Sequence, residues 1–221
     1  MNVKVIIPSA LASNLIQCVQ SLLTLDKGLQ PSSIIVVDDG AKAESMEALP
    51  GVTWVDGVKP FVFARNVNRG ILAAGDADVI LMNDDAVLTT AFGFSRWYEA
   101  MQDQRNTVCS AAIVGTVCNP RQLAQSSDTF RPEPNHLAFV AVYIPRPVIH
   151  KVGWLDERFT SYGFEDLDYC RRVREAGCKL ATWDGCVVDH SGFSTFRTNL
   201  EWPRLLQEGR QIYHEKWGVS G

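Results

Sequence analysis

The sequence has 221 residues, enough for one globular domain with a substantial core. Hydrophobic residues make up 46% and charged residues 21%, and the net charge of -4 excludes a general attraction to nucleic acid or anionic membranes. No apolar run approaches the roughly 20 residues of a membrane-spanning helix, and the N-terminus lacks a secretory pattern. The six cysteines form neither a CxxC pair nor a zinc-like group with histidine, which indicates reduced thiols in a cytoplasmic protein.

Strands and helices alternate through the first half of the chain. Val3–Ile7 is a continuous apolar run that ends at Pro8, and apolar residues at helical spacing follow from Leu11 to Leu23. Further strands are predicted over residues 32–37, 52–55 and 78–82, and a helix over 66–74. This order with short connections predicts a mainly parallel central sheet flanked by helices in a single α/β domain.

The second half has a different character. An aromatic-rich helix is predicted over Ala91–Met101, and β-like runs over Val108–Val117 and Leu137–Ile144. Between those runs, Asn119–Asn135 is rich in Pro, Ser, Gln and Asn, which suggests a mobile loop or lid. A helical tail from about residue 201 is expected to cap the core or, alternatively, to pair with a second copy of the chain.

Acidic residues follow two of the predicted strands. The run that starts at Asp78 is followed by Asn83, Asp84 and Asp85, and an earlier strand ends in Asp38-Asp39. Ligands bind where parallel strands end, and a divalent cation is the usual partner of adjacent carboxylates. A polar turn after a strand is the alternative interpretation.

A third acidic group opens a predicted helix. Glu165, Asp166 and Asp168 fall in its first turn, with Gly177 as the stop signal. Acids in a first turn are also favoured by the helix dipole alone. The aromatic and glycine residues before them nevertheless suggest a carboxylate presented beside an apolar wall, where it could act as a general base. His190 ends a later strand and is a candidate metal ligand.

Taken together, the ordered motifs resemble the family 2 glycosyltransferases with the GT-A fold over about residues 3–192. The motifs that carry the resemblance are Val5-Ile6-Ile7-Pro8, Val36-Val37-Asp38-Asp39-Gly40, Ala64-Arg65-Asn66-Val67-Asn68-Arg69-Gly70-Ile71, Asn83-Asp84-Asp85, Leu155-Asp156-Glu157-Arg158-Phe159, Glu165-Asp166 and His190. Any one of these motifs is common, and their order along the chain is what makes the resemblance specific.

The resemblance implies how a nucleotide sugar would bind. Three residues would line the base and ribose: Pro8, Asp38 and Asp39. Arg65 and Asn68 match the segment that approaches the nucleotide and its phosphates, although Arg69 could take the arginine's part. The donor would be a UDP-, GDP- or dTDP-sugar.

It also implies a metal site. Asn83-Asp84-Asp85 stands where the family has DxD, and the Asn at the first position removes one charge. Asp84 is expected to face the ribose or sugar, Asp85 to bind Mn²⁺ or Mg²⁺, and His190 to be a further metal ligand. The cation would neutralise the diphosphate leaving group.

The resemblance further implies an inverting transfer with Asp166 as the general base. Glu165 and Trp154 would hold the acceptor or donor sugar. The acceptor would be a glycan, a lipid-linked sugar, a protein or a nucleobase. Residues of about 1–118 would form the donor half, about 136–192 the acceptor half, and 201–221 the tail.

Other functions fit the sequence less well. A sugar-nucleotide nucleotidyltransferase would carry a glycine- and lysine-rich loop after the first strand, and a dehydrogenase would carry GxGxxG, but the chain has Pro8-Ser9-Ala10-Leu11 there. A non-catalytic nucleotide-sugar or glycan-binding module is favoured only by Asn83. The presence of Asp166 argues against that module.

Overall fold

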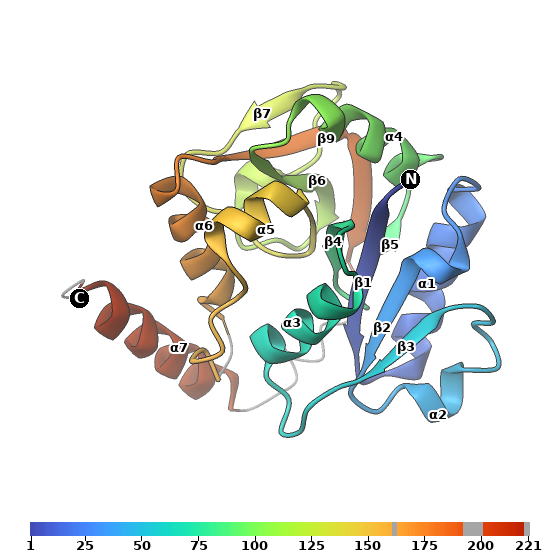
Figure 1. Cartoon of the computed structure of the whole chain (residues 1–221), viewed down its shortest axis with the longest axis horizontal. Helices are drawn as coiled ribbons and strands as arrows, with labels where there is room; N and C mark the ends of the chain where they lie inside the picture. The colour runs from blue at the N-terminus through green and yellow to red at the C-terminus, as the bar shows by residue number, and fades with distance from the viewer. Residues whose placement is uncertain (161–162, 192–200, 219–221) are drawn as a thin grey trace.

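The computed structural model describes residues 1–160, 163–191 and 201–218. Within them, nine strands form one sheet in the order β3-β2-β1-β4-β8-β6-β9-β5, with β7 paired to β9 (Figure 1). The strands are β1 Val3–Ser9, β2 Ile34–Asp38, β3 Thr53–Asp56, β4 Asp78–Met82, β5 Val87–Leu88, β6 Thr107–Gly115, β7 Phe130–Pro132, β8 Ala141–Ile144 and β9 Lys179–His190.

Helices cover both faces of this sheet. The α-helices are α1 Ala12–Leu25, α2 Lys42–Ser45, α3 Phe63–Ala73, α4 Gly93–Ala100, α5 Arg146–Val152, α6 Glu165–Glu175 and α7 Trp202–Trp217. The short 3₁₀ turns are η1 Pro31–Ser33, η2 Met101–Asp103 and η3 Pro120–Gln122. Apolar residues of α1 and α4 belong to the core on one face, and those of α3, α5 and α6 to the core on the other.

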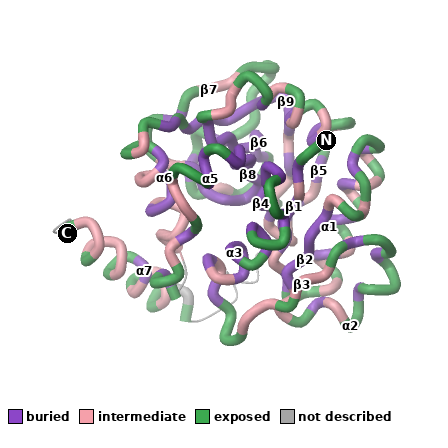
Figure 2. Tube along the Cα trace, in the orientation of Figure 1, coloured by how far each residue is buried: buried purple, intermediate pink, exposed green. Residues whose placement is uncertain are grey.

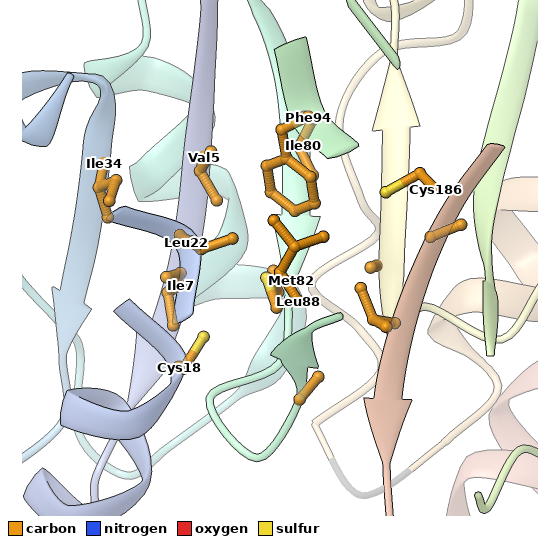
Figure 3. Close-up of a cluster of buried hydrophobic side chains, with 14 of the residues drawn as sticks. Val5, Ile7, Cys18, Leu22, Ile34, Ile80, Met82, Leu88, Phe94 and Cys186 are labelled. Atoms are coloured by element: carbon orange, nitrogen blue, oxygen red, sulfur yellow. The ribbon is translucent and has the colours of Figure 1, made fainter. Parts of the chain in front are cut away.

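The central strands contain continuous apolar runs because both faces are buried, as Figure 2 shows for β1, β2 and β4. On one side, Val5, Ile7 and Ile80 of the sheet pack with Leu22 of α1 and Phe94 of α4 (Figure 3). Alternate residues such as Ile6 face the other core. This double burial explains why continuous apolar runs in the sequence predict these strands.

A glycine lets α3 approach the sheet closely. A Cβ atom on Gly70 would lie 2.3 Å from Cγ2 of Ile6 in β1, so no side chain fits there. The close packing fixes α3 against β1 and β2, and with it the residues that the helix carries toward the strand ends.

The α/β sheet predicted from the sequence is confirmed; one half of it is parallel and the other half is mixed. β3, β2, β1 and β4 are parallel. β8 is antiparallel to both of its neighbours, β4 and β6, whereas β6 and β9 are parallel to each other. The sheet is therefore mixed beyond β4, because β8 runs in the opposite direction between two strands that share a direction.

The first strand is longer than predicted. β1 continues through Pro8, which pairs with Val37, and ends at Ser9. Proline lacks only the N–H donor, so a position near the strand end tolerates it. The extension brings Ser9 to the edge where β2 ends, and the N–H of Asp39 donates to the Ser9 carbonyl at 2.8 Å.

The segment over 119–135 makes several contacts with the rest of the domain, and its role as a mobile lid stays a prediction. The Gln122 amide bonds to both backbone groups of Ala138, at 2.7 and 3.0 Å. Arg131 forms a two-pronged pair with the buried carboxylate of Asp184, at 2.6 and 2.9 Å. β7, which lies inside this segment, adds a strand to β9.

Helix α7 packs intramolecularly, as expected of a tail that caps the core. Figure 1 shows it beside α6. Lys216 Nζ lies 2.6 Å from carboxylate oxygens of both Asp156 and Asp168, and the Trp217 indole donates to Asp168 at 2.9 Å. Residues 219–221 of the predicted tail lie outside the described residues.

Candidate functional site

Five strands deliver their last residues to the same edge of the sheet. β1, β2 and β4 are parallel in register, and β6 and β9 run side by side to Gly115 and His190. The positive φ of Gly115 (93°) and its lack of a side chain allow the backbone of Ser191 to pass close by. Polar residues at or just after these strand ends form the candidate site.

The acids after β2 have different surroundings. One oxygen of Asp38 accepts backbone N–H groups of Gly40 and Lys42, both at 2.9 Å, and so holds the turn into α2. Oδ1 of Asp39 is buried and has no partner among the described residues. Burial raises the pKa of Asp39, an effect that Lys59 opposes. Asp39 therefore offers an unused acceptor beside Ser9, at the end of β1.

Asp84 is held by the end of β1. The Ser9 hydroxyl donates to its Oδ2 at 2.6 Å. Burial, with a contribution from the charge of Asp85, raises the pKa of Asp84 to about 6. Its neighbour Asn83 donates its backbone N–H to the Val140 carbonyl at 2.8 Å, which fixes the turn against the start of β8.

Asp85 and His190 are 105 positions apart in the sequence but lie next to each other in the structure. Nε2 of His190 lies 3.2 Å from Oδ1 of Asp85, and Nδ1 lies 2.5 Å from the Thr116 carbonyl. A carbonyl only accepts, so Nδ1 carries the hydrogen, and in the neutral ring Nε2 is then a lone-pair donor directed at the carboxylate. Two such groups facing each other suit a shared cation.

A divalent cation fits this pair only with help from a ligand. Within the described part of the chain, no group of three or more His, Cys, Asp or Glu side chains is arranged to hold a metal. Asp85 and His190 would supply two positions, which leaves the others for phosphate oxygens and water, as Mg²⁺ and similar ions commonly bind.

Glu165 and Asp166 begin α6 directly after Phe164, which adopts a left-handed conformation (φ 72°). Asp166 Oδ1 accepts the N–H of Leu167 at 2.7 Å, while Oε2 of Glu165 is buried without a partner among the described residues. Burial and the charge of Asp166 raise the pKa of Glu165 to about 8. Burial also raises the pKa of Asp166, and His136 opposes that shift.

The segment that leads into β8 links this pair to the strand-end acids. The Phe139 backbone hydrogen-bonds to the Asp166 carboxylate, which lowers its pKa against the effect of burial. The next residue, Val140, accepts the N–H of Asn83. Asp166 and Asn83 therefore bind to the backbone of adjacent residues, Phe139 and Val140. No sequence pattern indicated Ser9, His136 or this link, because each depends on contacts between segments that are far apart in the sequence.

The two candidates on α3 contact the protein itself. The Asn68 amide is 3% exposed and bonds to both backbone groups of Leu155, at 2.9 and 3.0 Å, and to Glu157 at 3.0 Å. Arg65 lies 3.5 Å from Glu157. Arg69 is exposed one turn further along the helix. Asn68 therefore anchors the loop after α5, and both hydrogens of its Nδ2 are used within the protein.

Trp154 is the predicted residue that the structure places apart from the others. It lines a cavity with the end of α3 and with Arg146 of α5. Arg146 donates its backbone N–H to Asp78, the first residue of β4, whereas the candidate acids follow the last residue of that strand. Trp154 therefore lies toward the opposite edge of the sheet.

Comparison with solved structures gives the same architecture. GalNAc-T7 with UDP, GalNAc and Mn²⁺ matches with a TM-score of 0.69 at 13% identity, over 96% of this chain and 49% of that one. The mannosyltransferase PcManGT from Pyrobaculum calidifontis, in complex with GDP-Man and Mn²⁺, matches with a TM-score of 0.68 at 16% identity, over 97% of this chain and 64% of that one. At such identities the likeness concerns the GT-A fold alone, and this chain spans between about half and two thirds of their length.

No curated protein sequence matches the chain. None of the helices described is both long and apolar enough to cross a membrane. A family model, described as glycosyl transferase family 2, matches residues 4–155, which is well over half of the sequence. The chain therefore belongs to glycosyl transferase family 2.

Proposed function

We propose that the protein is an inverting glycosyltransferase that moves a sugar from a nucleoside-diphosphate sugar to an acceptor hydroxyl. The observation that carries the proposal is the shared sheet edge, where Asp39, Asp84 and the Asp85–His190 pair follow the strand ends and Asp166 reaches the same β8 segment as Asn83. Family membership supports this proposal.

The donor would bind along the strand ends. Asp39 has an unused, buried acceptor for an N–H or O–H of the nucleoside, and Asp84 is oriented by Ser9 toward the same edge. A Mn²⁺ or Mg²⁺ ion held by Asp85 and His190 would supply positive charge against the diphosphate. The two similar structures contain UDP and GDP-mannose, so uridine and guanosine nucleotides are the first donors to test, followed by dTDP.

Asp166 would act as the base. The acceptor oxygen bonds to the anomeric carbon from the side opposite the diphosphate, the bond from that carbon to the diphosphate oxygen breaks, and the acceptor proton passes to the Asp166 carboxylate. This single displacement inverts the anomeric centre. Glu165, whose raised pKa keeps it protonated at neutral pH, would donate a hydrogen bond to a sugar hydroxyl.

We further propose that residues of about 1–118 bind the donor and about 136–192 the acceptor. The acceptor classes remain those named from the sequence: glycan, lipid-linked sugar, protein or nucleobase. The cytoplasmic location and association through α7 also stay predictions.

A thermal-shift experiment tests donor binding. We expect UDP or GDP with Mn²⁺ to raise the melting temperature, because a ligand that binds only the folded state stabilises it. The same nucleotide without the metal, or with Asp85→Ala, should give a smaller shift. If no nucleoside diphosphate or its sugar shifts the melting temperature in the presence of Mn²⁺ or Mg²⁺, the proposal is wrong.

Asn83 is the one feature that favours a binding module without turnover. Donor hydrolysis separates the two functions, since a transferase slowly passes its sugar to water. We expect the wild type to hydrolyse a bound donor and Asp166→Asn to bind the donor equally but lose at least about a hundredfold in rate. Nucleotide binding without hydrolysis or transfer by the wild type would instead identify a binding module.

A further inference from the structure

A second cavity, of about 410 Å³, lies at the other end of β4. Its walls include Ile71 and Leu72 at the end of α3, Asp76 before β4, and Arg146 and His150 of α5, with Trp154 at its margin. The five residues of β4 alone separate this end from the candidate acids by roughly 13 Å, since a strand rises about 3.3 Å per residue. The cavity is therefore separate from the proposed transfer site.

Polar groups around this cavity lack partners in the part of the chain that is described. The Arg146 residue is 8% exposed, and its Nη2 atom is buried and makes no hydrogen bond within the described residues. Asp76 and His150 are exposed to solvent on the cavity walls and make no hydrogen bond to other described residues, so their polar groups are accessible to a ligand. The buried Arg146 donor carries a free-energy cost without a partner, whereas the exposed polar groups can exchange water for the hydroxyl groups of a ligand.

The apolar part of the cavity is exposed. Trp154 is 45% and Leu72 is 66% exposed, and both are among the large hydrophobic side chains that the fold leaves uncovered. An indole has a flat apolar face, an electron-rich ring surface and one N–H donor. The volume lies within the range of about 300–1,000 Å³ that is typical of small-ligand sites.

Charge indicates the class of ligand. The positive charge of Arg146 faces the negative charges of Asp76 and Asp78, so it is already balanced. A phosphate or carboxylate ligand would need surplus positive charge, which the cavity does not offer. A neutral molecule with several hydroxyl groups and one apolar face meets both the unpaired donors and acceptors and the indole.

We infer that this cavity is a second carbohydrate site, which binds a neutral sugar unit of a glycan against Trp154, apart from the site of transfer. The choice of a glycan as ligand rests on the proposed glycosyltransferase function. Such a site would hold a distant part of an acceptor or product chain and raise its local concentration. In this second site Trp154 would bind a sugar unit that lies away from the reacting carbon.

Titration with neutral tetrasaccharides, without nucleotide or metal, tests the inference. The probes are cellotetraose, maltotetraose, xylotetraose, mannotetraose and chitotetraose, measured by calorimetry and tryptophan fluorescence. We expect at least one to bind the wild type, and to bind Trp154→Ala at least about tenfold more weakly. Asp76→Asn and His150→Ala should weaken the same probe several-fold, whereas Met46→Ala, an exposed hydrophobic control on the other side of the sheet, should not.

Two results would overturn the inference. One is that no probe binds up to about 10 mM. The other is that a probe binds Trp154→Ala as tightly as the wild type. Asp166→Asn should bind the probe normally. The failure of the proposed function would appear separately, as a lack of nucleotide binding and donor hydrolysis in a protein that still binds the tetrasaccharide through Trp154.

Discussion

Glu165 carries an energetic cost at neutral pH because its surroundings favour the protonated acid. Burial and Asp166 raise the pKa of Glu165 from 4.5 to about 8. Between these values the folded protein holds a proton that the unfolded chain has released, so stability is highest at low pH and falls as pH rises through this window. We expect Glu165→Gln to reduce the loss of unfolding free energy between pH 5 and pH 8. Urea unfolding at pH 5, 6, 7 and 8 measures it. A slope equal to that of the wild type would contradict the raised pKa.

The same pair allows the base to be identified. At pH 7 Glu165 is mostly protonated, so Glu165→Gln changes little in charge and should retain turnover within about tenfold, whereas Asp166→Asn removes the proposed base and should lose at least about a hundredfold. The two isosteric changes are matched in size and burial. Initial rates at saturating donor check the prediction, and equal losses for both variants would contradict the assignment of Asp166.

The Asp85–His190 pair should bind a cation only as a unit with the donor. Removing either ligand leaves one protein group, so Asp85→Ala and His190→Ala should each weaken Mn²⁺-dependent nucleotide binding by about tenfold or more. Calorimetry with and without Mn²⁺ measures the effect. His214→Ala, on α7, is the control. A Mn²⁺ dependence that survives both substitutions would rule out this site.

At the scale of elements, α7 holds the helix that carries the proposed base. Asp168, one turn into α6, is fully buried and is bonded by Lys216, Trp217 and Arg172. The guanidinium of Arg171 lies 4.0 Å from the centroid of the Trp217 ring. Lys216 also binds Asp156 of the loop that Asn68 anchors. Lys216 therefore connects the start of α6 with the loop held by α3.

Lys216→Met should disturb this connection. We expect a loss of about 2–4 kcal/mol in unfolding free energy, because one partner of a largely buried ion pair is removed. The catalytic rate should fall while the dissociation constant for donor stays within about twofold. Arg204→Met is the matched control, since among the described residues Arg204 pairs with Glu201 and Glu208 on the exposed surface of its own helix, and its loss should leave the unfolding free energy nearly unchanged. An effect on donor affinity as large as that on rate would contradict a positioning role.

The sequence predicted strands and helices well where an apolar run or a regular apolar period marks the buried residues. It predicted them poorly where a strand exists only because it pairs with another strand. β1, β2, β4 and α3 were expected because their apolar runs or periods are regular. The two-residue β5 and three-residue β7 have no such pattern, because they exist only as partners of β9. The first half of β9 was missed because Lys179, Asp184 and Gly185 interrupt its apolar pattern, while pairing with β6 maintains the strand.

At the scale of the whole molecule, the α/β architecture could be inferred from the sequence but the inner layout of the site could not. Acids at strand ends and the family motifs predicted one functional edge, and family membership is confirmed. The contacts that set each side chain, such as Ser9 with Asp84 or Asn68 with Leu155, cross 75 and 87 positions of sequence and leave no local pattern. Trp154 follows α5, which the sequence did not predict, and so its position at the far edge could not be foreseen.

Asp78 links the two halves of the sheet through side-chain hydrogen bonds, and we expect the stability of the whole molecule to depend on these bonds. Asp78 is 4% exposed and accepts bonds from Tyr143 of β8 at 2.6 Å, from the N–H of Arg146 at 2.7 Å, and from both terminal nitrogens of Arg105. Burial alone would raise the pKa of Asp78, but the hydrogen bonds from Arg105, Arg146 and Tyr143 outweigh it and hold the pKa below its ordinary value.

Asp78→Asn should therefore unfold both halves together at lower urea concentration. We expect a loss of about 2–3 kcal/mol at pH 7, less than for a fully buried pair because the Arg105 side chain is 38% exposed. A carboxyl with a lowered folded-state pKa stabilises above its unfolded pKa and loses that contribution as pH falls, so the difference between variant and wild type should shrink below pH 4. Asp103→Asn, an exposed acid nearby, is the control. A single unfolding transition that shifts for Asp78→Asn alone would support one cooperative sheet, whereas separate transitions for the two halves would contradict it.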